Sequence, residues 1–434
     1  MRGIVMVHDG LVWLMLFGLL ACGVPIFVSL GVATTAVLFL TDIPLVMIPL
    51  DLYKVSEMFP LVAVAAFVLA GCIMERGGLA QEIVNVASIF FGHVRGGLGI
   101  VTIIGCMFFA AMIGSGPGTV AAMGALMIPA MVRAGYKKEY ATGVCCTGGT
   151  LGILIPPSNP MIVYGVIGNV SVSALFTAGF VPGFLVGLAL MATAVYFARK
   201  ANFPVLQQTY TTKEALMVVW HAKWSLLAPV VILGGIYTGA FTPVEASIVA
   251  VVYSFLIGWF VHKKLDWNGL KESLAMTNGV TGTVLAVVGV SILFGRFVTM
   301  YQVPQRLAEA VLSVSTDPII VLSAITIFLF FLGMFLETLS TIVILTPVVL
   351  PLLKKIGVDP VHFGILLVMT NEVALLSPPL GVNLFVASKI SGLSLEKVSK
   401  AAFPYMCVII VLCFLVILFP EIPLFLPKAL GIYK

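Results

Sequence analysis

The chain has 434 residues, of which 61% are hydrophobic and only 9% are charged, and its mean hydropathy is +1.17. Because a soluble domain carries about 25% charged residues, this composition excludes a soluble protein and indicates an integral membrane protein of many helices. The apolar runs are continuous over about 20 residues and do not alternate over about 10, which excludes a membrane β-barrel. A net charge of +5, carried mostly by loops, indicates membrane topology and not binding to nucleic acid.

The first elements in chain order are two spans and an amphipathic segment. Leu11–Leu40 predicts one membrane span with Pro25 near its middle, and Val55–Met74 predicts the next. Thr41–Lys54 between them, which carries Asp42, Asp51 and Lys54, is expected to be a loop. Residues 75–97 mix charged and apolar residues at helical spacing. This pattern predicts an amphipathic helix that lies at the interface or braces other elements.

Two apolar segments then flank the sequence GSGPGT. Leu98–Ile113 and Val120–Val132 are each short for a full crossing, so a re-entrant hairpin with its tip at these glycines is expected. The next segment, Tyr140–Gly168, predicts a helix broken at two prolines, and Ala174–Ala198 predicts an uninterrupted span. In hydrocarbon each freed backbone N–H or C=O costs several kcal/mol. The two breaks therefore indicate backbone that faces a polar cavity or an ion.

The middle of the chain is a polar connector that holds a short helix, Arg199–Lys223, followed by spans at Trp224–Gly239 and Val244–Val261. The second half then repeats the first. A span is expected at Asn278–Tyr301, a short arm at Val303–Ser315, and two hairpin segments around FLETLS at Ile319–Leu336 and Thr341–Leu353. A broken helix follows at Val361–Ile390 and a last span at Ala401–Phe419. These elements divide the chain into five parts. They are an N-terminal scaffold helix (1–54), a first inverted repeat (55–199), connector and scaffold helices (200–277), a second inverted repeat (278–419) and a C-terminal tail (420–434).

The repeat has a constant offset of 222 residues and needs no gap. This offset aligns Thr119 with Thr341 and places Pro156-Pro157 on Pro378-Pro379. Paired hydrophobic segments that Gly and Pro interrupt in both halves are the best indication of a transporter's binding site in a sequence.

The distribution of basic residues predicts the orientation in the membrane. With three crossings and a hairpin in each repeat and two spans between them, the two repeats start on opposite faces and are inverted. One face then collects roughly sixteen Lys and Arg and the other about six, which makes the first face cytoplasmic. The N-terminus is expected in the cytoplasm and the C-terminus in the periplasm. The two hairpin tips would enter from opposite faces and meet near the middle of the membrane.

Oxygen donors gather at the interrupted helices and suit a small hard cation such as Na⁺. In the two halves they are Ser115, Thr119, Gly148, Gly149, Thr150 and Ser158, and Glu337, Thr338, Ser340, Thr341, Asn371, Glu372, Ser377 and Asn383. The alternative is ordinary helix packing, because small residues line helix contacts in all membrane proteins. The duplication at a fixed offset favours an ion site.

An anionic cargo is predicted by two further features. Helices begin just after Pro157 and Pro379, and the positive ends of their dipoles favour an anion. Arg296 is the one Lys or Arg deep inside an apolar segment, and a charge in the membrane is functional by default. It could contact the cargo, pair with Glu337 or Glu372, or extend to the interface from its position near Tyr301. Glu245 lies near a loop and is expected to cap or anchor a helix.

Other function classes find little support in the residues. The five histidines are scattered in loops, and the Gly-rich segments lack the Lys-Ser/Thr of a phosphate-binding loop. We therefore expect no metal cluster and no nucleotide. An intramembrane enzyme with Glu337 or Glu372 as general acid or base would need a paired nucleophile or metal, and neither is apparent.

Six motifs resemble the large membrane subunit of tripartite ATP-independent periplasmic (TRAP) transporters. They cover most of the chain in the family's order and read LAGCIMERGGLA, GHVRGGLG, GSGPGTVAAMGALMIPAM, GGTLGILIPPSNPMIVYG, GGIYTGAFTPVEAS and LLSPPLGVNLFVASKISG. The resemblance implies an all-α polytopic inverted-repeat fold of the elevator type, with two re-entrant hairpins and two broken helices. It also implies two partners, a small four-helix membrane subunit and a periplasmic binding protein that delivers the substrate.

The resemblance further assigns the sites, by motif. The sodium ligands fall on Ser115, Gly116, Thr119, Thr150 and Gly152 in the first half, and on Glu337, Thr338, Gly381, Val382 and Asn383 in the second. The substrate contacts fall on Arg296, on Pro156, Pro157, Ser158 and Asn159, and on Ser377, Pro378 and Pro379. The expected function is Na⁺-coupled uptake of a small organic anion across the bacterial inner membrane without ATP. A standalone sodium–anion symporter of the same fold is the alternative.

Overall fold

The computed structural model describes residues 2–40, 44, 46–205 and 211–433, and every regular element within those ranges is a helix. Six of the described helices are long and apolar enough to cross a membrane. Two bent helix pairs, with bends of 56° and 50°, raise that number to eight if each pair is one span. The predicted all-α polytopic membrane fold is confirmed.

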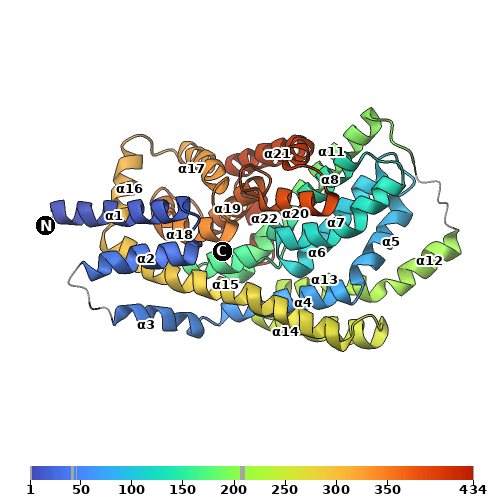
Figure 1. Cartoon of the computed structure of the whole chain (residues 1–434), viewed down its shortest axis with the longest axis horizontal. Helices are drawn as coiled ribbons and strands as arrows, with labels where there is room; N and C mark the ends of the chain where they lie inside the picture. The colour runs from blue at the N-terminus through green and yellow to red at the C-terminus, as the bar shows by residue number, and fades with distance from the viewer. Residues whose placement is uncertain (1, 41–43, 45, 206–210, 434) are drawn as a thin grey trace.

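The N-terminal segment forms more helices than the sequence predicted. The expected single span Leu11–Leu40 is two helices, α1 (Arg2–Ala21) and α2 (Ile26–Phe39), which pack side by side (Figure 1). The chain reverses between them because Gly23 adopts a φ of +78° and Pro25, which has no N–H, cannot continue the first helix. Of the loop expected before the next span, residues 41–43 and 45 lie outside the described residues.

A layer of helices, here called the supporting layer, lies along one side of the molecule (Figure 1, lower half). It contains α3 (Met47–Lys54), α4 (Pro60–Arg76), α13 (Lys223–Tyr237), α14 (Pro243–Leu256) and α15 (Trp267–Met300). Helix α4 packs along both α14 and α15. The connector helix α12 (Thr212–His221) precedes α13, and residues 206–210 of the connector lie outside the described residues.

The predicted amphipathic segment forms α5 (Leu79–Phe91), and its counterpart in the second half is α16 (Val303–Leu312). Two polar contacts join α5 to the supporting layer. Ser225 Oγ donates a hydrogen bond to Glu82 at 2.6 Å, and His262 Nε2 lies 3.2 Å from the same carboxylate. Helix α5 therefore links the hairpin that follows it to α13 and to the segment after α14, where His262 lies.

The first hairpin consists of α6 (Gly97–Ile113) and α7 (Gly116–Arg133), which run antiparallel. Gly105 of α6 faces Met123 of α7, and the Thr102 hydroxyl lies 3.4 Å from the sulfur of Met131. The turn is made by Gly114, whose φ of +64° favours glycine.

The second hairpin, α17 (Pro318–Gly333) and α18 (Thr338–Lys355), is less tightly closed. A cavity of about 640 Å³ lies among four helices: the two arms of this hairpin, α17 and α18, and the neighbouring helices α16 and α1. Its lining is apolar apart from Ser315, and includes Trp13, Leu332 and Val348. The two hairpins thus differ in packing although they occupy equivalent positions in the sequence.

The helices that follow each hairpin are broken as predicted. In the first half they are α8 (Lys138–Gly148), α9 (Leu151–Leu154) and α10 (Asn159–Gly168), and in the second half α19 (Pro360–Leu375) and α20 (Val382–Ser391). The long helices α11 (Val172–Lys200) and α21 (Leu395–Leu418) complete the two halves. The expected C-terminal tail contains one more helix, α22 (Glu421–Ala429), which packs on α11 and α19.

The offset of 222 residues relates helices as well as motifs. Added to both ends of α7, Gly116–Arg133, it gives the two ends of α18, Thr338–Lys355. The equivalent parts also exchange partners, because α10 packs on α18 while α20 packs on α7. The second part of each broken helix therefore lies against the hairpin of the other half, and this brings oxygen donors from both halves to one region.

Candidate functional site

The tip of the first hairpin is a compact group of oxygen atoms around Ser115. Ser115 is the N-cap of α7, and its carbonyl oxygen accepts a hydrogen bond from Thr119 Oγ1 at 2.8 Å. Gly152 of α9 packs directly on this tip, because a Cβ at that position would lie 2.5 Å from the Ser115 carbonyl oxygen and 2.6 Å from Thr119 Oγ1. Three of the predicted sodium ligands are thus brought together, and only glycine fits at the third.

Asn383 also lies at this first tip. A Cβ on Gly116 would lie 3.3 Å from Asn383 Oδ1 and 3.4 Å from the Gly149 carbonyl oxygen. Asn383 donates its amide to the Cys146 carbonyl oxygen at 3.3 Å. The structure therefore groups Asn383 with the first set of predicted ligands, whereas the sequence grouped it with the second half.

The second tip reproduces part of the first. Thr341 Oγ1 donates to the Glu337 carbonyl oxygen at 3.2 Å, which is the Thr119–Ser115 bond moved by 222 residues. Thr338 is buried, but Glu337 is exposed. The sequence made Glu337 and Glu372 the two candidates for buried acids. The prediction is wrong for Glu337 and confirmed for Glu372, which has none of its surface exposed.

The break in the first half is buried. Pro156, Pro157, Ser158 and Asn159 are all inaccessible to solvent or nearly so, and Ser158 caps α10. Ser158 Oγ donates to the Ile153 carbonyl oxygen at 2.5 Å. The backbone N–H of Asn159 donates to the Gly114 carbonyl oxygen at 3.4 Å, which joins the break to the first hairpin tip.

The break in the second half is open. Ser377 is buried and donates to the Val373 carbonyl oxygen at 2.7 Å, but Pro378, Pro379 and Leu380 are exposed. The Leu380 N–H donates to the Met334 carbonyl oxygen at 3.2 Å, so this break also touches its own hairpin tip. Gly381 and Val382 follow it, at the start of α20. The two equivalent breaks therefore differ in accessibility.

Several buried side-chain oxygens on the broken helices have no hydrogen-bond partner among the described residues. They are Asn159 Oδ1, Asn371 Oδ1, Asn383 Oδ1 and both carboxylate oxygens of Glu372. Buried polar atoms are normally paired, so each such atom requires an explanation. Amide, hydroxyl and carbonyl oxygens suit alkali and alkaline-earth ions. In the described part of the chain, no three of His, Cys, Asp and Glu come close enough to hold a metal.

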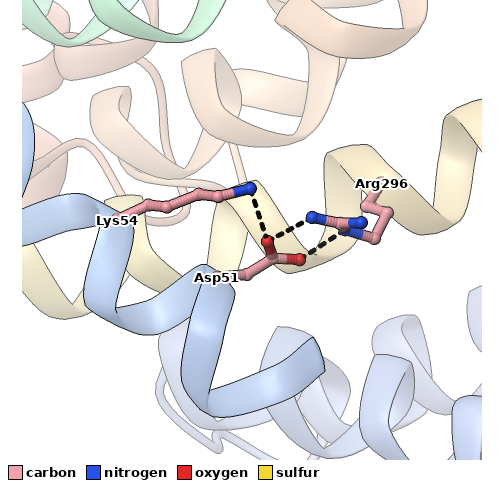
Figure 2. Close-up of polar contacts among 3 residues, drawn as sticks. All are labelled: Asp51, Lys54 and Arg296. Atoms are coloured by element: carbon pink, nitrogen blue, oxygen red, sulfur yellow. Dashed lines mark hydrogen bonds and ion pairs between the residues drawn. The ribbon is translucent and has the colours of Figure 1, made fainter. Parts of the chain in front are cut away.

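Arg296 lies on α15, away from the tips and the breaks, and its side chain contacts α3. Its guanidinium group donates two hydrogen bonds to the Asp51 carboxylate, and Lys54 Nζ lies 3.2 Å from the same group (Figure 2). The acidic partner is thus neither Glu337 nor Glu372. Asp51 was missed in the sequence, where it was assigned to a loop, although its spacing of three residues from Lys54 is typical of a helix.

Glu245 has the role that the sequence predicted. The Thr242 N–H donates to the Glu245 carboxylate at 2.8 Å, and the Glu245 N–H is 3.3 Å from Thr242 Oγ1. This reciprocal pair is a capping box that starts α14.

Comparison with known proteins agrees with this architecture. A family model described as "Tripartite ATP-independent periplasmic transporter, DctM component" matches residues 13–422. The chain belongs to this family. It is a TRAP transporter large permease and not an enzyme, as the sequence indicated.

The relatives of this large permease carry three different substrate names. It is 40% identical over 405 residues to the C4-dicarboxylate TRAP transporter large permease protein DctM of Pseudomonas aeruginosa, with 93% of this chain and 94% of the relative covered. It is 35% identical over 413 residues to the sialic acid large permease SiaM of Vibrio cholerae, covering 95% and 96%. The isethionate permease DctMQ of Oleidesulfovibrio alaskensis is 40% identical over 407 residues, which are 94% of this chain but 64% of that protein.

A solved structure has the same fold as this TRAP permease. The YdaH transporter of Alcanivorax borkumensis superposes with a TM-score of 0.64 over 85% of this chain and 87% of that chain, at 13% sequence identity. At this identity the likeness concerns the fold alone.

Proposed function

We propose that this permease imports a small organic anion across the bacterial inner membrane, coupled to Na⁺ and without ATP. It would act as the large subunit of a tripartite system, with a small four-helix membrane subunit and a periplasmic binding protein. The observation that carries the proposal is the first hairpin tip, where Ser115, Thr119 and Asn383 present oxygens from both halves of the chain to one point.

The cargo is proposed to bind at the two breaks. Helices α10 and α20 begin there, and the positive ends of their dipoles favour an acid group. The relatives' names include a C4-dicarboxylate, sialic acid and isethionate, all of which carry a carboxylate or a sulfonate. Arg296 is left out of this proposed site, because its guanidinium is already held by Asp51.

We also propose an elevator movement, because the two hairpins contact the supporting layer in different ways. Helix α4 packs along α6, the first arm of its hairpin, whereas its counterpart α15 packs along α18, the second arm. The break at Pro156–Asn159 is buried and the equivalent break at Ser377–Pro379 is largely exposed. Such differences between inverted repeats are expected when one part of a transporter is displaced toward one face.

The orientation is proposed from charge, with the C-terminus in the periplasm and the N-terminus in the cytoplasm. The division of the first segment into α1 and α2 makes the side of the N-terminus depend on whether both helices cross. Labelling of a cysteine introduced at Gly3 from either face of intact vesicles measures it directly. Labelling from the periplasmic face would overturn the cytoplasmic assignment.

The test of the proposed function is transport in proteoliposomes. The full chain would be reconstituted with its small subunit and supplied with its binding protein, and uptake of labelled succinate, N-acetylneuraminate and isethionate would be measured under an inward Na⁺ gradient. Uptake of at least one anion should require Na⁺, and an equal K⁺ gradient should not replace it. Uptake that is indifferent to Na⁺ would contradict the coupling, and uptake without the binding protein would favour a standalone symporter.

A further inference from the structure

Glu372 is one of the oxygen donors of the second half, but the two sets of sodium ligands that the family resemblance implies do not include it. It lies on α19 with none of its surface exposed, and neither carboxylate oxygen has a hydrogen-bond partner among the described residues. An isolated carboxylate in such a place is strongly unfavourable unless a cation or a proton neutralises it.

The neighbours of Glu372 point to a cation. The Thr150 side chain lies beside the carboxylate, but its hydroxyl donates to the Thr147 carbonyl oxygen at 2.9 Å. Because its hydrogen is used in this bond, Thr150 Oγ1 keeps lone pairs that could bind a cation beside the Glu372 carboxylate. The Cys413 side chain of α21 also lies near this carboxylate. Within the described ranges, no Lys, Arg or His forms an ion pair with Glu372.

The two residues also have a special position in the fold. The offset of 222 residues that relates the halves takes Thr150 to Glu372. Equivalent positions of two inverted repeats can touch only near the axis that relates them. A ligand held between Thr150 and Glu372 would thus bind both repeats at once, close to Gly149, whose carbonyl oxygen lies at the first hairpin tip.

We propose an additional sodium site on the internal two-fold axis, with Glu372 as its anionic ligand and with Thr150, which also belongs to the first predicted set, as its second ligand. The inference rests on the proposed sodium coupling. An empty site leaves a bare carboxylate in the interior and an occupied site is neutral, so the ion lowers the cost of moving this part of the protein through the membrane. The two predicted sodium sets lack such a buried charge, because Glu337 is exposed.

The test is equilibrium binding of ²²Na⁺ to the purified full chain in detergent. Glu372→Gln keeps the size of the side chain and removes its charge, and it should lower the saturating amount by about one Na⁺ per chain. Glu309→Gln, which changes an exposed glutamate on α16, is the matched control and should bind as much Na⁺ as the wild type. Equal saturation of Glu372→Gln and wild type would overturn the inference.

A second measurement needs no variant and decides the matter if Glu372→Gln fails to fold. Infrared difference spectra of the wild-type chain should show a carboxylate band that shifts when Na⁺ is added. A buried carboxylic-acid band that persists in saturating Na⁺ would show that a proton neutralises Glu372, and would overturn the inference. If the wild-type chain binds no Na⁺ at all, the proposed sodium coupling itself fails, which is a different result from equal binding by wild type and variant.

Discussion

At the scale of single residues, the clearest structural interaction is the ion pair of Asp51 and Arg296. The Asp51 side chain is fully buried, and its two oxygens accept both bonds from the guanidinium. Removing Arg296 would leave the buried Asp51 carboxylate with Lys54 as its cationic partner, and removing Asp51 would leave the partly exposed guanidinium without its two acceptors. The pair therefore fixes α3 to α15, a role that differs from the cargo contact predicted for Arg296.

Variants of this pair separate the two roles. Arg296→Gln and Asp51→Asn alone should each lower the melting temperature of the purified chain by several degrees, consistent with a loss of about 1.5–3 kcal/mol for hydrogen bonds between charged groups. The double variant should recover much of the stability and most of the uptake, because no unpaired charge remains. Uptake that stays abolished in a stable double variant would instead favour direct contact between Arg296 and the cargo.

The oxygens of the first tip lead to a second prediction at this scale. Ser115→Ala removes a hydroxyl beside the Ser115 carbonyl oxygen, which accepts a hydrogen bond from Thr119. The change should raise the Na⁺ concentration for half-maximal uptake by roughly 5- to 30-fold, as expected for the loss of about 1–2 kcal/mol of binding free energy. Thr193→Val, which removes a hydroxyl bonded to the Ala189 carbonyl oxygen far along α11, is the control. An unchanged Na⁺ dependence in Ser115→Ala would count against this ligand.

At the scale of elements, the close approach of α9 to the first hairpin depends on Gly152. Gly152→Ala would place a Cβ 2.5 Å from a backbone oxygen, so the tip must shift. We expect a loss of stability of about 1–3 kcal/mol, typical of overpacking, and Na⁺ binding at least 10-fold weaker.

Gly279→Ala is the matched control for Gly152→Ala. Gly279 lies on α15, and a Cβ there meets nothing within 4 Å, so the change should leave Na⁺ binding intact and stabilise the helix by about 0.5–1 kcal/mol. Wild-type Na⁺ affinity in Gly152→Ala would show that the tip is not part of a cation site.

At the scale of the whole molecule, the elevator proposal predicts which contacts must slide. Ser291 of α15 donates to the Val343 carbonyl oxygen of α18 at 3.3 Å, across the boundary between the supporting layer and the second hairpin. In a cysteine-free background, cross-linking Ser291→Cys to Val343→Cys with Hg²⁺ should abolish uptake, and release of Hg²⁺ by thiol should restore it.

The control is a pair within the part that is proposed to move. Gly168 of α10 faces Thr346 of α18, with 3.3 Å between a Cβ on the glycine and the threonine methyl group. Cross-linking cysteines at these two positions should leave uptake largely intact, because α10 and α18 would move together. Full uptake with α15 locked to α18 would contradict the elevator.

The sequence by itself determined the class, the order of the elements and the repeat. Long apolar runs must be helices in a membrane, because only helices and closed barrels satisfy the backbone there. Glycines and prolines show where those helices stop, so both hairpins and both breaks could be placed to within a few residues. The motifs GIYTGAFTPVEA and GTLGILIPPS together were specific enough to indicate the TRAP family.

Only the tertiary structure decided which of these elements meet. The reversal at Gly23 and Pro25 was hidden because an apolar hairpin and one kinked span have the same composition. The pairing of Asp51 with Arg296, the place of Asn383 at the first tip and the contact of Thr150 with Glu372 all join residues more than 200 positions apart. Such contacts depend on which helices pack together in space, and hydropathy along a single chain carries no information about that packing.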